Sequence, residues 1–447
     1  MSCMGSCCMS RRKRCIDLHG LTNAMIKELE IKNYKSIREL TLPLGRMNVF
    51  IGENGAGKSN ILEVIALAAA AAADKLDHEF LSSRGVRVTS PEFMRPAFPN
   101  ADPRAPIEVT AKSDNDQEVA FELNNDNTPY SKWISSISKG SFEITMPSPE
   151  QIFAGYFDIE DASERKNRIA AAAHFADVLK KSLNEYEERK ASGTLEDPIN
   201  LIRIAPEDIS LPLVQAIGRA VRKNTDQIPE LSNFVIFSPE NSALRTFDRE
   251  GQIEPLGING EGVLKLLSFY ASKHDDTTLA KVKGSLKLFD WFDDFQTESV
   301  QSDARLLVRD RFLDENVVGF DHRGTNEGFL FLLFHFLLFN SELTPKFFAI
   351  DNIDASLNPK LCEKLVQELS ALAKANDKQA ILTTHNPAVL DGLDLNDDEQ
   401  RLFVVSRGRD GTTKVKRIHK PEPVNGNNLR LSELFIRGLI GGLPKGF

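Results

Sequence analysis

The chain has 447 residues, of which 41% are hydrophobic and 27% charged, a composition typical of a soluble globular protein with room for two or three domains. No apolar run approaches the ~20 residues that a bilayer-spanning helix requires, so we expect no membrane association and a cytoplasmic protein. The net charge of −9 argues against a surface that binds nucleic acid over its whole extent, because such binding depends on neutralised phosphates.

Residues 1–24 precede the first strand-like pattern, and we expect them to form a disordered or non-native extension. The cysteines of this segment are Cys3, Cys7, Cys8 and Cys15. Only Cys362 follows, which excludes a disulfide-built fold. The spacing of the amino-terminal cluster matches no pair of C-x-x-C zinc knuckles.

A phosphate-binding pattern follows the first strands. Alternating apolar residues from Ile26 to Leu42 predict two short strands, and the apolar segment 48–51 predicts a third. The pattern G-x-x-x-x-G-K-S comes next, formed by Gly52, Glu53, Asn54, Gly55, Ala56, Gly57, Lys58 and Ser59. Its glycines allow backbone N–H groups to point at phosphates, at the positive end of a helix that begins near Lys58.

This loop predicts a nucleoside triphosphate site. The Lys58 ammonium can reach the β- and γ-phosphates, and the Ser59 hydroxyl can ligate Mg²⁺. The apolar strand before the loop and the helical pattern after it are the context that this chemistry requires.

The middle of the chain changes character twice. Segments 107–112 and 118–123, joined by a polar turn, predict an antiparallel pair that flanks a parallel core sheet. Residues 146–231 are charge-rich and predict a helical insertion. Strand character returns at 234–237, and a helix is predicted over 263–270.

A second group of polar residues lies beyond an apolar helix at 329–339. The apolar strand 346–350 ends in Asp351, which places a carboxylate at the carboxyl end of a buried strand, where ligands of open α/β sheets bind. Asp351 would hold Mg²⁺ through water. A helix over 359–375 and a strand over 379–384 follow, and His385 ends that strand.

Four segments of this chain resemble the ATP-binding-cassette ATPases of the SMC, RecF and OLD type, including stand-alone AAA family ATPases of bacterial defence systems. The segments are 31–37, 52–59, 350–359 and 382–387. The resemblance implies an α/β fold, namely an ABC-type head with a mixed core sheet, an antiparallel flanking sheet and a helical insertion. It divides the chain into a first ATPase lobe at 25–145, the insertion at 146–231 and a second lobe at 232–447.

The resemblance also implies ATP and Mg²⁺ as cofactors and a role for each matching residue. His385 corresponds to the switch histidine that contacts the γ-phosphate, and 355–358 to a dimer-contact loop. Asn326 and Gly328 stand where relatives carry the S-x-G signature, which caps the nucleotide of a second subunit. An ATP-dependent head-to-tail pair of identical chains is therefore implied.

Two positions depart from the resemblance. Relatives carry Glu directly after the magnesium-binding Asp, and this chain has Asn352, whose amide can orient water but cannot take its proton. Asp354, two residues later, could substitute. We therefore expect slow or conditional hydrolysis, completed by Asp354 or by a residue of another subunit. The second departure is Asn326 in place of Ser.

The sequence leaves three functions open. The first is a sensor subunit of a bacterial antiviral system that controls a separately encoded effector, a nuclease or a toxin. We favour it because of the acidic net charge, the short insertion and the missing Glu, and because the residues after His385 are too few for a nuclease domain. The second is a RecF-like DNA-binding ATPase in recombination or repair. The third is a nucleotide-binding scaffold without useful turnover.

Overall fold

The computed structural model describes residues 24–99, 101–128, 131–139, 228–247, 249, 251–273, 276–300, 303–422 and 429–443. The amino-terminal cysteines and nearly all of the predicted helical insertion lie outside these ranges. Ala24, the last residue of the expected extension, is described and buried.

The centre of the molecule is a six-stranded sheet in the order β14-β13-β3-β12-β11-β7. Its strands are β3 (Met47–Ile51), β7 (Ile236–Phe237), β11 (Phe347–Ile350), β12 (Gln379–Thr384), β13 (Gln400–Arg407) and β14 (Thr413–Ile418). All neighbours are parallel except β13 and β14. Every residue of β3, β11 and β12 is buried, because a parallel sheet is covered on both faces.

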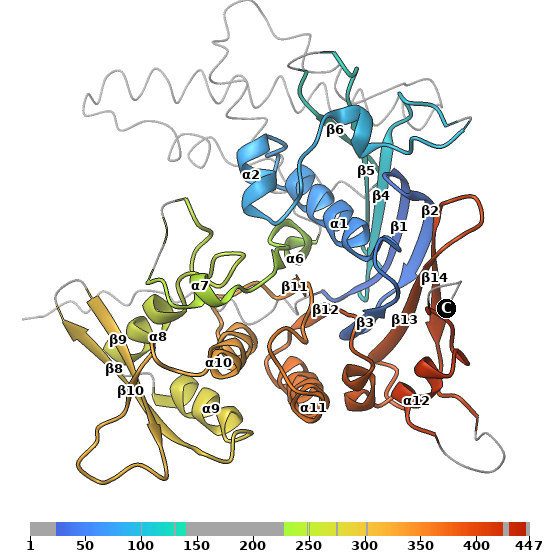
Figure 1. Ribbon diagram of the computed structural model, residues 1–447. Helices are drawn as coiled ribbons and strands as arrows, with labels where there is room; N and C mark the ends of the chain where they lie inside the picture. The colour runs from blue at the N-terminus through green and yellow to red at the C-terminus, as the bar shows by residue number, and fades with distance from the viewer. Residues whose placement is uncertain are drawn as a thin grey trace, which may run out of the picture.

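A five-stranded antiparallel sheet lies beside this core in the order β2-β1-β4-β5-β6. Its strands are β1 (Ile26–Tyr34), β2 (Ile37–Pro43), β4 (Ile107–Ser113), β5 (Glu118–Asn124) and β6 (Ile134–Lys139). Helix α1 (Lys58–Ala72) lies beside both sheets (Figure 1). It shares one hydrophobic core with them, which includes Val64 of α1, Phe50 of β3 and Val109 of β4. The short elements of this side are α2 (His78–Ser83), η1 (Pro91–Met94) and α6 (Pro229–Ser232).

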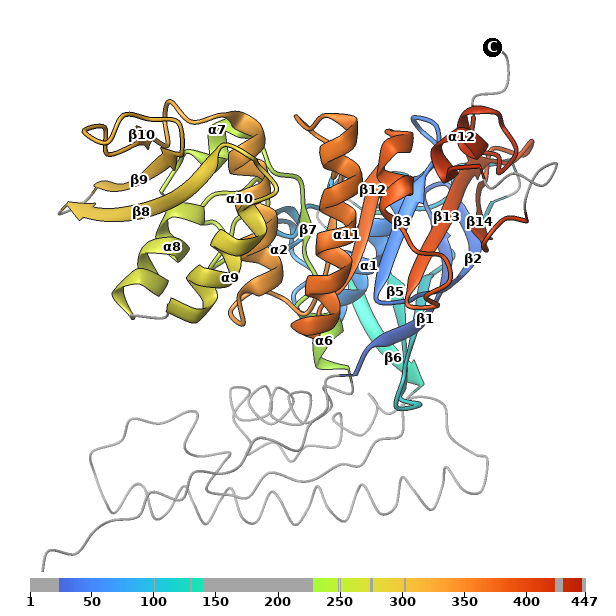
Figure 2. The same ribbon diagram turned by 90° about the horizontal axis from the view of Figure 1, so that it is seen from below.

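Helices cover the other face of the core sheet. Helix α10 (Glu327–Asn340) is apolar around its whole circumference and buried from Gly328 onwards, as expected for a central helix. Beside it lie α11 (Pro359–Ala375), α8 (Val263–Ser272), α9 (Asp276–Leu286) and α7 (Asn241–Leu244). The segment η3 (Pro387–Gly392) and α12 (Leu431–Ile436) complete this layer near β13 (Figure 2).

A third, three-stranded sheet has the order β10-β9-β8. It consists of β8 (Phe292–Val300), β9 (Asp303–Asp310) and β10 (Phe320–Asp321), and it lies at the end of the molecule opposite β13 and β14 (Figure 1). The sequence did not predict this sheet. The mixed core sheet and the antiparallel flanking sheet are as predicted, whereas the strand expected at 234–237 is limited to Ile236–Phe237. None of the described helices has both the length and the apolar character needed to cross a bilayer.

Candidate nucleotide site

The glycine-rich loop joins β3 to α1 and ends at the positive end of that helix. Gly57 is the N-cap of α1 with φ of 108°, and Gly55 has φ of 75°. Both values lie in the left-handed region that favours glycine. The first N–H groups of α1 therefore face the loop, where an anion would be stabilised by the helix dipole.

Two distant strands hold the loop from behind. A Cβ at Gly57 would collide with the Thr413 hydroxyl at the start of β14 and lie 3.1 Å from Ser36 Oγ, just before β2. Thr413 Oγ1 donates to the carbonyl of Ala56 at 3.0 Å and lies 2.7 Å from Ser36 Oγ. Asn60 of α1 also donates to Ser36 Oγ, at 2.7 Å. Ser36 lies in segment 31–37, which carries the resemblance, but the sequence predicted no contact with the loop for Ser36, Asn60 or Thr413.

Lys58 is only 6% exposed, and its ammonium faces the loop. Its Nζ donates to the carbonyls of Gly52 at 2.8 Å and Glu53 at 3.1 Å, and lies 3.5 Å from Nδ1 of His385. Burial lowers the pKa of Lys58 to about 8, although the carboxylates of Asp351, Glu53 and Asp354 oppose that effect. The cation is thus held by backbone oxygens at the position where an anionic ligand would compete for it.

Ser59 and Asp351 lie together although 292 residues separate them in sequence. Ser59 Oγ donates to Asp351 Oδ2 at 3.4 Å. Asp351 also accepts from the Thr383 hydroxyl of β12, and its backbone N–H donates to the carbonyl of Phe237 at 2.8 Å. A hydroxyl and one carboxylate fit Mg²⁺, which keeps waters and phosphate oxygens as its other ligands. In the described part of the chain no group of three or more acidic, His or Cys residues forms a metal cluster.

The two candidate water-activating positions differ in their surroundings. Asn352 has φ of 55°, and its backbone N–H donates to Thr383 Oγ1 at 3.0 Å. The Asp354 carboxylate accepts from the Thr384 hydroxyl at 2.6 Å, and its charge raises the pKa of both Lys58 and His385. Asp354 therefore lies on the same side as the phosphate loop.

His385 is placed as a neutral group. Partial burial and the neighbouring Lys58 cation lower its pKa below the usual histidine value. A neutral imidazole has one donor and one acceptor nitrogen, so it can donate one hydrogen bond to a phosphate oxygen.

The signature candidate lies against the loop that follows β11. Asn326 caps α10 by accepting from the N–H of Phe329 at 3.3 Å. A Cβ at Gly328 would lie 3.3 Å from the carbonyl oxygen of Ser356, so the two segments are tightly packed. The Ser356 hydroxyl donates to the Glu327 carboxylate. The segment 326–328 and the loop 354–357 are therefore in direct contact within one chain.

Arg87 is a further basic residue near the site that the sequence did not predict. Its Nε donates to the buried carboxylate of Glu63 on α1 at 2.5 Å, while its side chain stays 68% exposed. That hydrogen bond raises the pKa of Arg87, and the charges of Glu63 and Asp351 add to the effect. Glu63 also accepts from Lys35 at 2.5 Å and from the Tyr34 hydroxyl at 3.2 Å. The sequence did offer one indication, namely Glu63 among the alanines and apolar residues of the predicted helix. A carboxylate buried there requires cationic partners, although the sequence does not say which.

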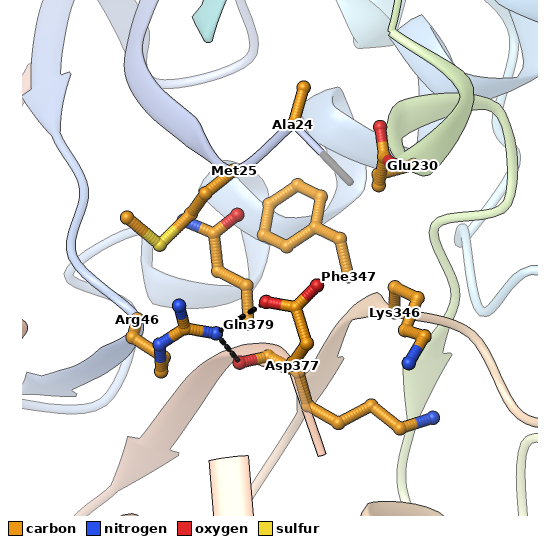
Figure 3. Close-up of a pocket in the computed structure, with 9 residues that line it drawn as sticks. Ala24, Met25, Arg46, Glu230, Lys346, Phe347, Asp377 and Gln379 are labelled. Atoms are coloured by element: carbon orange, nitrogen blue, oxygen red, sulfur yellow. Dashed lines mark hydrogen bonds and ion pairs between the residues drawn. The ribbon is translucent and has the colours of Figure 1, made fainter. Parts of the chain in front are cut away.

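A surface pocket lies away from this site. It is lined by Ala24, Met25, Arg46, Glu230, Lys346, Phe347, Asp377, Lys378 and Gln379 (Figure 3). Phe347 and Gln379 begin β11 and β12, so the pocket lies at the amino ends of the parallel strands, opposite the phosphate loop. The buried Lys378 ammonium is already satisfied by the carbonyls of Ser341 at 2.8 Å, Thr344 at 2.9 Å and Pro345 at 3.1 Å.

Comparison with protein families shows where the chain belongs. A model of the AAA ATPase domain matches residues 25–390, which include the phosphate loop, Asp351 and His385. The chain belongs to the AAA ATPase domain family. ATPases of this family generally use ATP and Mg²⁺.

Two curated relatives match over short segments. An OLD nuclease of Thermus scotoductus is 44% identical over 43 residues, which is 10% of this chain and 8% of the relative. An uncharacterized protein of Methanocaldococcus jannaschii is 52% identical over 44 residues, which is 10% of this chain and 20% of the relative. The chain thus aligns with far less than two thirds of either relative. Together with the family match, these similarities support the predicted SMC/OLD type of ATPase.

Solved SMC head domains are also similar. The SMC head domain from Thermotoga maritima is 14% identical with a TM-score of 0.42, covering 88% of this chain and 99% of that one. The Pyrococcus furiosus Smc head domain, solved with the C-terminal domain of ScpA, is 18% identical with a TM-score of 0.46, covering 89% of this chain and 96% of that one.

Proposed function

We propose that this chain is a slow ATPase whose ATP-bound form pairs head to tail with a second copy and thereby controls a separate effector protein. One observation carries the nucleotide part of the proposal. The buried Lys58, the carboxylates of Asp351 and Asp354, and the imidazole of His385 converge on the phosphate loop from α1, the end of β11 and the end of β12.

The residues of this chain would divide the work as follows. The backbone of the loop and the Lys58 ammonium bind the triphosphate, which replaces the carbonyls of Gly52 and Glu53 as the partner of Lys58. Ser59 and Asp351 would hold Mg²⁺, which neutralises phosphate charge when bound. Arg87, which Glu63 of α1 holds, would supply a further positive charge.

Asp354 is the general base of the proposal. Asn352 occupies the usual position but has no basic atom, whereas the Asp354 carboxylate keeps acceptor capacity beyond its hydrogen bond from Thr384. That hydrogen bond occupies one acceptor site of the carboxylate and fixes its orientation. Asp354 lies two residues beyond the position of the usual Glu, so we propose that it reaches the attacking water less directly and that turnover is slow, which suits a protein whose ATP-bound state is the signal.

Steady-state ATPase measurements test this assignment. Asp354→Asn should lower turnover at least tenfold without changing ATP affinity, because general bases typically contribute 10²–10⁴-fold. Asn352→Glu should raise turnover. Asp116→Asn, in the exposed turn between β4 and β5, is the matched control for loss of one carboxylate. Normal turnover in Asp354→Asn together with no gain in Asn352→Glu would remove the assignment, and undiminished ATP binding by Lys58→Ala would remove the site.

The effector part of the proposal needs a different experiment. Its support is the acidic net charge of −9 and a site chemistry that favours a long-lived ATP complex. The native protein should co-purify with a second protein, a nuclease or a toxin, and the amount retained should change when a nonhydrolysable ATP analogue replaces buffer. Retention that is identical with and without the analogue would contradict ATP control.

A further inference from the structure

Arg245 holds the turn that precedes the signature segment. It is the C-cap of α7, and its guanidinium donates to three backbone carbonyls of the turn 322–325. The bonds go to His322, to Arg323 at 2.9 Å and to Thr325 at 2.9 Å. Its Nε donates to Asn241 Oδ1 at 2.9 Å, which fixes the guanidinium on α7.

The turn leads directly into Asn326. Asp321 organises its N–H side, because its side chain accepts from the N–H of Arg323 at 2.8 Å and its carbonyl accepts from Gly324 at 2.9 Å. Arg245 binds the carbonyl oxygens of the same turn, those of His322, Arg323 and Thr325. A planar guanidinium offers five donors in a fixed arrangement, so it can order three carbonyls together, which a lysine ammonium on a flexible stem does less well.

The segment from β7 to Arg245 is hydrogen-bonded to the residue that follows β11, Asp351. Phe237 ends β7, and its carbonyl accepts the backbone N–H of Asp351 at 2.8 Å. The chain then runs through Ser238, whose N–H donates to Ile258 at 2.7 Å, into α7, which packs beside α10 (Figure 2). One short segment therefore contacts Asp351 at one end and the signature turn at the other.

We propose that Arg245 is a positioning residue that sets the Asn326–Gly328 segment for the nucleotide bound by a second copy of this chain. This inference rests on the proposed head-to-tail pairing. Arg245 does not touch the nucleotide of either chain. It acts through the backbone of residues 322–325. Its loss should therefore weaken the site on the second copy, in trans, and spare ATP binding by the chain that carries the substitution, in cis.

Single variants provide the first measurement. Arg245→Ala should bind ATP with unchanged affinity but lower both ATP-dependent pairing and turnover by about tenfold, the scale of losing charged hydrogen bonds. Arg245→Lys should recover only part of the loss, because an ammonium has three donors and cannot serve the three carbonyls and Asn241 at the same time. ATP titration with each variant also reports whether the protein is folded.

Mixing variants separates positioning in trans from a merely structural role. Lys58→Ala lacks a working phosphate loop but keeps an intact signature segment, whereas Arg245→Ala has the reverse defect. An equal mixture should therefore form pairs with one complete site and hydrolyse ATP several times faster than either variant alone. A mixture of Arg245→Ala with Gly328→Glu should turn over no faster than Arg245→Ala alone, because both chains then carry a defective signature segment.

The controls distinguish the two levels of the proposal. A mixture of Gly328→Glu with Lys58→Ala tests head-to-tail pairing itself, and failure of that mixture to recover turnover would overturn the proposed function. Recovery in that mixture, together with no recovery in Arg245→Ala plus Lys58→Ala, would overturn the role of Arg245. Wild-type turnover of Arg245→Ala alone would also overturn it.

Discussion

Lys58 makes ATP binding depend on pH. In the free protein burial lowers the pKa of Lys58 to about 8, so above pH 8 this amine is mostly neutral. A bound triphosphate favours the ammonium form and raises that pKa. ATP binding should therefore take up close to one proton per site at pH 9 and almost none at pH 7, and the affinity for ATP should fall as the pH rises above 8. Calorimetric titration in buffers of different ionisation enthalpy measures the proton count.

Two features make this prediction specific to Lys58. The second ionisation of a phosphate group has its midpoint near pH 6, roughly one unit below the lower test pH and three units below the upper one. The lowered pKa of His385 favours the neutral imidazole in the free protein. Any proton that His385 takes up on binding would add to the uptake at pH 7 rather than at pH 9, because the usual histidine pKa already lies below pH 7. Equal proton uptake at pH 7 and pH 9 would show that Lys58 is already fully charged in the free protein.

The same lowered pKa affects the free energy of unfolding, which should rise with pH where the affinity for ATP falls. The unfolded chain keeps Lys58 protonated up to about pH 10.4, whereas the folded, ligand-free protein releases that proton near pH 8. Between these values the unfolded state binds more protons, so this residue contributes stability that rises with pH. Below pH 8 its buried ammonium costs stability, which is the ordinary cost of holding a cation ready for an anionic ligand.

Residues that act through a local motif could be predicted from the sequence, and residues that act through tertiary contacts could not. The spacing of the glycines with Lys58 and Ser59 reflects one continuous backbone loop, and Asp351 directly follows an apolar strand. Arg87 and Arg245 have no such local pattern. Their roles depend on a buried carboxylate of α1 and on three carbonyls of a remote turn, and only the fold brings those partners to them.

At the scale of elements, β14 supports the phosphate loop, and a pair of glycine variants can measure that support. Gly55 and Gly57 both have positive φ, so Ala at either position costs about 1 kcal/mol for the left-handed backbone. Only at Gly57 does the new Cβ meet Thr413 and Ser36, whereas nothing lies within 4 Å of a Cβ at Gly55. Overpacking adds roughly 1–3 kcal/mol, so Gly57→Ala should lower the Tm of the nucleotide-free protein clearly more than Gly55→Ala. Equal Tm values for the two variants would mean that β14 does not support the loop.

Elements with a regular apolar pattern were predictable, and those whose apolar face is irregular were not. The helix 359–375 carries a polar N-cap, Asn358, a following proline and an amphipathic pattern, and α11 has the predicted bounds. By contrast, β8 has the sequence FDDFQTESV, in which acids interrupt the expected alternation. A register shift between Phe292 and Asp294 accommodates that interruption, and such a bulge cannot be predicted from period-two alternation.

At the scale of the whole molecule, the segments before and after the predicted insertion share one sheet. β3 pairs with β12 on one side and β13 on the other, so its neighbours come from the far end of the chain. The carboxyl end of β3 leads into the phosphate loop, and that of β11 leads into Asp351. Both ends therefore lie on the same edge of the sheet, with β12 between the two strands. We propose that the two predicted lobes, 25–145 and 232–447, move as parts of one sheet rather than as independent domains, which suits an ATPase that signals by pairing.

The acidic character of the molecule leads to a prediction that separates effector control from a RecF-like role. Many basic side chains on the described surface already pair with carboxylates, including Arg46 with Asp377, Lys112 with Glu28, and Arg401 and Arg417 with Asp398. These pairs compensate part of the positive charge on that surface, and the whole chain carries a net charge of −9, which disfavours binding through neutralised phosphates. Double-stranded DNA should therefore change the ATPase rate less than about twofold at either 50 or 200 mM salt, because a protein that makes many phosphate contacts would respond steeply over that range.

Lys58→Ala measured in parallel reports any contaminating ATPase. Strong stimulation by DNA at low salt that disappears at high salt would instead favour recombination or repair.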